Sequence, residues 1–449
     1  MHTKKIVVER IQATIKNNPA IYWNFIGYGV TAVAGPLAAL VIAKYFSPSE
    51  QGYYYTFNSL LGLQIFLELG FGVCLVHIVS HEFASLELDK TDVLTGPEKS
   101  LHRLASLSQL AHKWFSIASL IFALGVGIAG EFFFTRFGDG VAWRLPWWML
   151  CIGASSGLYQ LAPMSVLQGC NFMAWTARAR AIQNAVRSLL VLALILCGGG
   201  LFSASIAACV SSLILFLLLN RKWNRFFKAI HVLKCKFAVS WKKEIWPFQS
   251  RIAMSWASGY FIFSTFNPII FAKVSPAAAG RFGITWTMIS ALSNVSQIFV
   301  TTRQAELGIK MVKEEWVELR RLWFKILKQS IGVCILLGFV FLFFLELVRH
   351  YTKFGDRFLG FPQVFPLLLA AIVNQYIFTV ATLTRAEKKE PFLWPSVAGA
   401  AFIFGGNLFF VTRFGVSGLA WNYCAITCLS VFWASFIYKT TAMVRHFSV

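Results

Sequence analysis

The sequence predicts an all-α integral membrane protein with twelve transmembrane helices in two lobes of six. Hydrophobic residues make up 57% of the 449 residues, and charged residues only 13%. Apolar runs long enough to cross a bilayer recur along the whole chain. A six-residue pattern occurs twice, 228 positions apart, which indicates an internal repeat. Duplicated halves are common in secondary transporters, so these observations together favour two similar lobes.

The repeated pattern is Ser-Pro-x-x-x-Gly, at residues 47–52 and 275–280. Each copy follows an apolar run that ends in Ala-Lys, and each opens another apolar run. Serine can cap a helix N-terminus, and proline suits the first helical position. In the first copy Glu50 completes a possible capping box, whereas the second copy has no carboxylate at that place. We expect each copy to form the outer corner between the first and second helices of its lobe.

The predicted spans follow the apolar runs. They cover residues 20–46, 53–80, 113–135, 145–168, 177–197, 200–220, 247–272, 280–302, 326–348, 360–383, 391–412 and 415–438. This divides the chain into an N-terminal segment, a first lobe, a linker and a second lobe, at 1–19, 20–220, 221–246 and 247–449. The N-terminal segment fits an interfacial helix or a frayed tail. The linker alternates basic and aromatic residues, so we expect an amphipathic helix on the inner surface.

The basic residues support this topology. The net charge is +22, but 31 of the 41 Lys and Arg residues lie in segments that the alternation places on one side or in the adjoining ends of the spans, and nine lie on the other side. This bias indicates that both termini are cytoplasmic and argues against a nucleic-acid partner. Because each lobe has six spans, an even number, both lobes begin on the same side of the membrane. The repeats are therefore expected to be parallel, around an axis along the membrane normal, with a cavity between them.

The motifs of several enzyme classes are missing from the sequence. It contains no G-x-x-x-x-G-K-[ST], H-E-x-x-H or C-x-x-C pattern. Most of the nine cysteines lie in apolar runs, which is typical of packing residues. The histidines are scattered and are expected at the inner surface. We therefore predict a protein that is not an enzyme and has neither a metal nor another cofactor.

One acidic residue lies inside a predicted span. Glu68 comes one turn after Gln64, about 22 Å down its helix from the outer edge at 1.5 Å per residue. A carboxylate near the midplane is costly unless it faces protein or water. The pair is a candidate site for coupling transport to a proton or a sodium ion. The alternative is a structural ion pair or helix contact.

Polar residues also share one face of the fifth span. Arg180, Asn184 and Arg187 follow the i, i+4, i+7 rule, with Arg187 near the midplane. The planar donors of arginine suit phosphate or carboxylate groups. The alternative is that Arg187 pairs with Glu68. A substrate role predicts that Arg187→Ala stops transport but leaves folding intact.

The second lobe carries further polar candidates. The eighth span has a stripe at helical spacing that includes Ser290, Asn294 and Gln297, and Arg303 follows at its inner end. Such a stripe lines either a wet cavity or a helix–helix seam. Arg251 is a positive-inside anchor or a ligand-binding residue, and Gln375 on the tenth span faces the cavity or a seam.

Several of these patterns resemble one family. The segments that carry the resemblance are Phe46 to Gly52, Glu68-Leu69-Gly70-Phe71-Gly72, Leu167-Gln168-Gly169, Val274 to Ser293 and the basic segment Lys310 to Arg321. They are similar to those of Wzx-type O-antigen and exopolysaccharide flippases, within the MATE-like (MOP) exporter superfamily. Here Thr301-Thr302-Arg303 replaces the proline frequent in that family near the inner end of the eighth span.

The resemblance implies a cargo and a mechanism. The cargo would be an oligosaccharide repeat unit on an undecaprenyl-pyrophosphate carrier, moved across the membrane for lipopolysaccharide or exopolysaccharide synthesis. Two lobes would open alternately to each side, with ion coupling, and the partners would be membrane lipids and polysaccharide polymerase or assembly proteins. The alternatives are a drug or organic-cation antiporter of the same superfamily, which predicts an acidic cavity, and a non-transporting partner of polysaccharide synthesis.

Overall fold

The computed structural model describes residues 19–89, 94–233, 235–352, 354–387 and 391–446. Helices occupy nearly all of these residues, and each predicted span coincides with one helix or with consecutive helices. Seven described helices are long and apolar enough to cross a membrane, and one bent pair raises this number to eight. The helix that carries the polar stripe of the eighth span is not among the seven. The expected interfacial segment 1–19 lies almost wholly outside the described residues.

Packing divides the chain into two compact units, neither of which is continuous in sequence. Unit 1 comprises residues 1–34, 63–135 and 142–256, and unit 2 comprises residues 35–62, 136–141 and 257–449. Residues 35–62 were predicted to belong to the first lobe. Their contacts instead place them in one unit with the C-terminal helices. Three α-helices contribute residues to both units: α2 (Pro19–Tyr45), α7 (Gly127–Phe137) and α12 (Trp246–Phe263).

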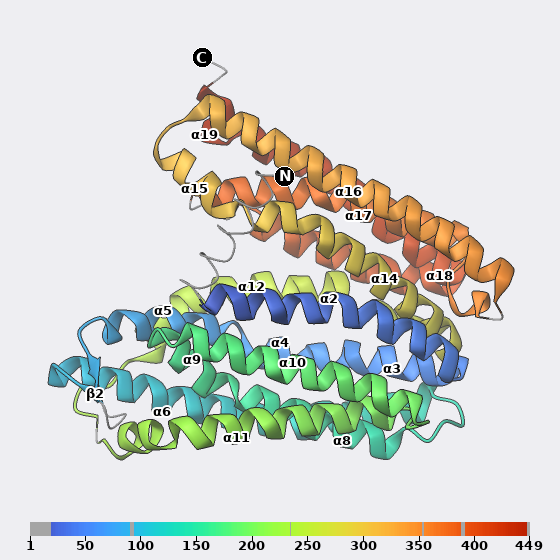
Figure 1. The fold of residues 1–449 in the computed structure, drawn as a ribbon. Helices are drawn as coiled ribbons and strands as arrows, with labels where there is room; N and C mark the ends of the chain where they lie inside the picture. Colours follow the sequence, from blue (N-terminus) through green and yellow to red (C-terminus); the bar gives the residue numbers. More distant parts are fainter. Residues whose placement is uncertain (1–18, 90–93, 234, 353, 388–390, 447–449) are drawn as a thin grey trace, which may run out of the picture. The chain divides into compact units, whose positions relative to one another are not determined.

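Unit 1 is a helical bundle with one short hairpin (Figure 1). Its further elements are α4 (Ile65–Glu68), α5 (Phe71–Phe83), β1 (Glu87–Leu88), β2 (Leu94–Thr95), α6 (Glu98–Ile121), the π-helical turn η2 (Phe122–Val126), α7 (Gly127–Phe137), α8 (Arg144–Tyr159), α9 (Leu161–Gly169), α10 (Met173–Leu196), α11 (Phe202–Val232) and the π-helical turn η3 (Trp241–Ile245). The strands β1 and β2 pair in antiparallel fashion. Helix α11 packs against α8 and α10, while α5 packs against α9.

Two parts of unit 1 differ from the sequence-based expectation. The helix predicted from residue 113 begins at Glu98, so that α6, η2 and α7 form one long helical run. The expected separate helix over 221–246 does not form. Its first half instead continues α11, and buried aromatic residues such as Trp223 and Phe226 hold this extension against the bundle. The alternation of basic and aromatic residues is thus the amphipathic end of a membrane helix.

Unit 2 contains the other helices. They are α3 (Pro48–Leu61), α13 (Phe266–Lys273), α14 (Pro276–Thr301), α15 (Gln304–Val312), α16 (Trp316–Tyr351), η4 (Gly355–Arg357), α17 (Phe361–Ala386), α18 (Leu393–Lys439) and α19 (Ala442–His446), with η1 (Gly62–Gln64) between α3 and α4. Helix α18 contains the last two predicted spans. Gly415, which lies at the start of the second of them, has a non-helical backbone conformation (φ 57°, ψ −144°) that bends the helix. Helix α14 packs on α3, α16 and α17, and α17 packs on α18.

The two copies of the repeated pattern cap helices as predicted and pack against each other. Ser47 and Glu50 form both bonds of a capping box, while Ser275 accepts a bond from a backbone N–H only. Gly52 lies against Pro276, and a Cβ on Gly280 would lie 2.8 Å from the carbonyl oxygen of Pro48. The contact is therefore reciprocal, because the glycine of each copy packs against the proline backbone of the other. The repeat brings α3 and α14 together at their N-terminal ends.

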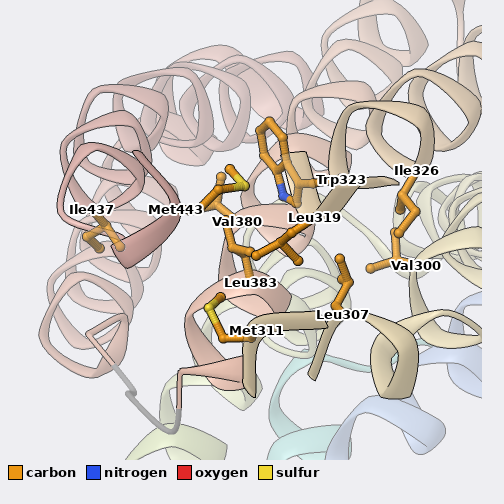
Figure 2. Packing of buried hydrophobic residues seen from close by; sticks show 10 residues of the cluster. All are labelled: Val300, Leu307, Met311, Leu319, Trp323, Ile326, Val380, Leu383, Ile437 and Met443. Atoms are coloured by element: carbon orange, nitrogen blue, oxygen red, sulfur yellow. The ribbon is translucent and has the colours of Figure 1, made fainter. Parts of the chain in front are cut away.

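A hydrophobic cluster closes the other end of unit 2 (Figure 2). It includes Leu307 and Met311 of α15, Trp323 of α16 and Met443 of α19, all of them buried. Stacking of Trp323 on Tyr438, with ring centroids 4.6 Å apart, ties α16 to α18. Because α15 and α19 are short, burial of these side chains rather than helix propensity holds them in place.

An ion-pair network fixes the segment after α11 to unit 1. Arg103 of α6 donates to Glu82 of α5 (2.7 Å) and to Glu244 of η3 (2.6 Å). Glu244 also accepts from the backbone N–H of Ser240 at 3.0 Å. The Arg103 guanidinium, followed by this backbone bond, lowers the pKa of the Glu244 carboxyl.

We expect Glu244→Gln to lower the stability of unit 1 slightly, and only above acidic pH. Because the folded-state pKa lies below the unfolded value of about 4.3, the stabilisation is complete above that value and is lost as the pH falls through the folded pKa. The carboxylate is partly exposed, so the loss at neutral pH should be about 1 kcal/mol or less. Melting temperatures of the two proteins should therefore differ at neutral pH and converge in acid. A constant difference across this range would contradict the ionic origin of the effect.

Candidate functional site

The second predicted span is broken at its acidic residue. Helix α4 ends at Glu68, and the next two residues, Leu69 and Gly70, both have left-handed backbones (φ 49° and 68°) before α5 begins. The helical runs on the two sides of this break meet at a bend of 42°. A left-handed leucine is strained. Non-helical backbone at membrane depth is tolerated where it is buried in protein or lines water, so the break marks Glu68 as a site candidate.

Small residues make room for this break. A Cβ on Gly72 would lie 3.2 Å from Oε1 of Glu68 and 3.1 Å from Oγ of Ser165, so the carboxylate lies over the first turn of α5. The partial positive charge of a helix N-terminus favours a carboxylate there. Nearby, a Cβ on Gly169 would lie 2.6 Å from Cβ of Val79, which brings α9 close to α5. Gln64, in η1, is exposed.

We expect Gly70→Ala to destabilise the fold by about 2–4 kcal/mol. A left-handed backbone costs a non-glycine residue about 1–2 kcal/mol, and overpacking typically adds about 1–3 kcal/mol. The new methyl group would lie 3.0 Å from Cβ of Ile252 on α12. Thermal unfolding of the purified protein measures the loss. Gly29→Ala is the control, because nothing lies within 4 Å of its Cβ position. Equal melting temperatures for the two variants would contradict the strained break.

Unit 1 contains a small polar cavity beside α10. It has a volume of about 180 Å³, and its polar lining comes from Arg180, Gln183 and Asn184 of α10 together with Gln160, which joins α8 to α9. Glu68 and Arg180 interact electrostatically. Two of the predicted residues, Arg180 and Asn184, are thus brought together. Arg187 is exposed and is not among the lining residues of this cavity.

Gln160 is the residue of this cavity that sequence reasoning missed. Its side chain is only 1% exposed, and its Nε2 donates to the backbone oxygen of Ser212 at 2.8 Å. Its Oε1 has no hydrogen-bond partner among the described residues. A buried acceptor without a donor costs about 1–3 kcal/mol, so this oxygen is suited to a hydroxyl or N–H of a ligand.

Unit 2 contains a larger cavity, on the stripe of α14. Its volume is about 250 Å³, and it is lined by Ser290, Asn294 and Gln297 of α14, by Gln375 of α17 and by further residues. All four were candidates from the sequence, and the structure brings them to one cavity. Of the described residues that line it, none is acidic or basic. Asn294 is exposed, and Ser290 and Gln297 are half-buried.

Aromatic side chains form another part of the cavity lining. Phe263, Trp286, Phe378 and Tyr423 all line the cavity. The Trp286 ring lies 5.6 Å from Tyr423 and 5.2 Å from Phe266, centroid to centroid, so the aromatic cluster holds it firmly. Flat apolar faces beside amide and hydroxyl groups are suited to sugar rings, which present C–H faces and hydroxyl edges.

The structure separates two roles among the amides of this cavity. Gln375 is fully buried and accepts from Ser330 at 2.8 Å, so it fixes the wall of the cavity. Its neighbour Asn374, which the sequence analysis did not select, donates to Tyr423 at 2.9 Å. Neither Asn294 nor Gln297 has a side-chain hydrogen bond with any described residue. These two amides are the groups of α14 that can bind a ligand.

The remaining predicted residues lie away from both cavities. Arg303 lies between the end of α14 and the start of α15. Its guanidinium donates to the side-chain oxygen of Gln329 on α16 at 2.7 Å. Thr302, part of the segment that replaces the family's proline, donates to the carbonyl of Ile298 at 2.7 Å and closes the last turn of α14. Arg251 is an exposed residue of α12 and lines neither cavity.

The fold is shared with known membrane transporters. No protein-family model matches the sequence, and no curated protein does either. Among solved structures, an inward-facing multidrug resistance MATE family transporter of the MOP superfamily has a TM-score of 0.67 at 13% identity, over 93% of this chain and 100% of its own. Lipid II flippase MurJ, inward closed, has a TM-score of 0.66 at 15% identity, over 94% of this chain and 88% of its own.

A third structure, that of the MATE multidrug transporter DinF-BH, has a TM-score of 0.64 at 14% identity and is matched over 96% of each chain. The likeness to all three covers nearly the whole chain. It confirms an all-α membrane protein with the two-lobe, twelve-helix fold of the MATE transporters and MurJ.

Proposed function

We propose that the protein moves lipid-linked oligosaccharides, with undecaprenyl pyrophosphate as the carrier, across the bacterial inner membrane by alternating access. The observation that carries this proposal is the chemistry of the cavity in unit 2. Amides, hydroxyls and aromatic rings line it, and no described lining residue is charged. Sugar hydroxyls cannot cross lipid without partners, because each unpaired polar group costs several kcal/mol there.

The polar groups of the cavity in unit 1 suit a pyrophosphate. Arg180 offers a cation for a pyrophosphate, and the unpaired oxygen of Gln160 offers an acceptor for a hydroxyl. Arg187 lies two turns beyond Arg180 on α10 and remains a proposed phosphate contact. Glu68, at the broken helix, is the proposed ion-coupling residue, because its interaction with Arg180 links its protonation to the charge of this cavity.

The second candidate is an organic-cation exporter, since two of the solved structures with this fold are multidrug transporters. Cation transport favours acidic residues in the binding cavity. The described residues that line the two cavities above include amides and one arginine but no carboxylate, and Glu68 interacts with that arginine. This chemistry favours the saccharide.

Loss of the protein in its own host is expected to cause lipid-linked oligosaccharide to accumulate on the inner leaflet. Extraction of lipids from a deletion strain, followed by mass spectrometry of their head groups, measures this and identifies the sugar. Re-expression of the intact protein should reverse the accumulation. A deletion strain with unchanged lipid-linked sugars and increased sensitivity to cationic drugs would instead support the second candidate.

A further inference from the structure

A third cavity lies in unit 1 and shares one lining residue, Gln160, with the cavity beside α10. Its volume is about 350 Å³, and it is formed by α6, by the junction of α8 and α9, and by the end of α11. Helix α11 supplies one face at a spacing of four residues: Phe216, Asn220, Asn224 and Lys228. This face is apolar at one end and becomes polar and then cationic along the helix.

The apolar-to-polar change occurs at the boundary of the membrane-spanning part of α11. Leu213, Phe216 and Leu217 are exposed by 55%, 46% and 53%, which suits contact with acyl chains. From Asn220 onward the helix carries Arg221, Lys222, Arg225 and Lys228, and the charge bias places this end at the cytoplasmic leaflet. The phosphates of phospholipids lie at this depth, just outside the hydrocarbon core.

Two histidines complete the polar end of the cavity. His112 of α6 and His231 of α11 have ring centroids 4.4 Å apart, at nearly right angles. The Nδ1 of His112 lies 2.8 Å from the carbonyl oxygen of Ser108, and since a carbonyl only accepts, this nitrogen carries the proton. His231 and Lys228 are exposed, so a ligand can reach them. None of the described lining residues is a carboxylate.

We propose that this cavity binds the phosphate of an anionic phospholipid of the cytoplasmic leaflet. Lys228 provides the cation, Asn224 and Asn220 donate from their amides, and the acyl chains run along the exposed apolar flank that contains Phe216. The surrounding arginines and lysines of α11 attract an anionic leaflet but do not line the cavity. A soluble phosphate would use the same donors but would gain nothing from the apolar flank.

The test is lipid binding to the full-length protein, purified in detergent and titrated with phosphatidylglycerol or phosphatidylcholine while native mass spectrometry counts the bound lipids. We expect phosphatidylglycerol to bind about tenfold more tightly. Both lipids carry the phosphate, but Lys228 would repel the quaternary ammonium of phosphatidylcholine. Lys228→Gln should remove this preference. Lys222→Gln makes the same charge change on the same helix outside the cavity and should preserve most of it.

Asn224→Asp provides a second variant, which adds a negative charge inside the cavity and should also abolish the preference for phosphatidylglycerol. Three results would overturn the proposal. The first is an equal loss of the phosphatidylglycerol preference in Lys228→Gln and Lys222→Gln, which would indicate diffuse attraction to basic residues. The second is equal binding of the two lipids by the intact protein. The third is displacement of phosphatidylglycerol by millimolar inorganic phosphate, which would indicate a site for soluble phosphate.

Discussion

Replacing Gly52 by alanine is expected to cost about 3 kcal/mol of stability and to separate α3 from α14. A methyl group at this position would lie 2.6 Å from the carbonyl carbon of Pro276, well inside the normal separation of about 3.5–4.0 Å between carbon atoms. The obstructing atoms belong to the backbone, so no change of rotamer relieves the overlap. Overpacking of this kind costs about 1–3 kcal/mol and occasionally more.

Thermal unfolding and size-exclusion chromatography of the purified variant measure this effect. Gly280→Ala should behave similarly, because its methyl group would meet the backbone of the first copy of the repeat. The matched control is Gly259→Ala in the same unit, where nothing lies within 4 Å and alanine is the better helix former. Equal melting temperatures for Gly52→Ala and Gly259→Ala would contradict the close backbone contact between the two copies of the repeat.

Replacing both Asn294 and Gln297 by leucine is expected to lower saccharide transport at least about tenfold without unfolding the protein. Their side chains make no hydrogen bonds with described residues, so the structure does not depend on them. A ligand in the cavity would lose two hydrogen bonds, each worth about 0.5–1.5 kcal/mol, and would face two new apolar groups. Initial rates of translocation in vesicles measure the loss.

Gln304→Leu is the control for this variant, since Gln304 is an exposed residue of α15 that does not line the cavity. Replacement of Gln375 is expected to differ in kind. Its side chain holds Ser330 in the fully buried wall, so its loss should lower the melting temperature as well as the transport rate. Full transport by the double leucine variant would remove α14 from the binding site.

The sequence was sufficient for the helices and for one face of the candidate site. Hydropathy alone located each span, and helical spacing placed Ser290, Asn294 and Gln297 on one face of α14, where all three line the cavity. Both predictions depend on patterns within a single helix. Asn374 could have been found too, since it is an amide next to Gln375 in the same span, but its role depends on Tyr423 of another helix.

The features that the sequence did not reveal depend on contacts between helices. The break after Glu68 contains no proline, and the left-handed backbone of Leu69 is imposed by its surroundings. Gly52 and Gly280 were recognised as parts of a capping pattern, whereas their close packing against each other requires the tertiary structure. Arg303 remains a candidate, but its hydrogen bond to Gln329, a residue of α16, was not visible in the sequence.

The most direct test of the proposed function is a comparison of two cargoes in the same vesicles. The purified protein is reconstituted with a lipid-linked oligosaccharide or with a fluorescent organic cation, and the appearance of each on the opposite side is followed with and without an ion gradient. We predict that the saccharide crosses only when the protein is present and that the cation does not cross. Protein-dependent movement of the cation, with the saccharide left in its original leaflet, would contradict the account.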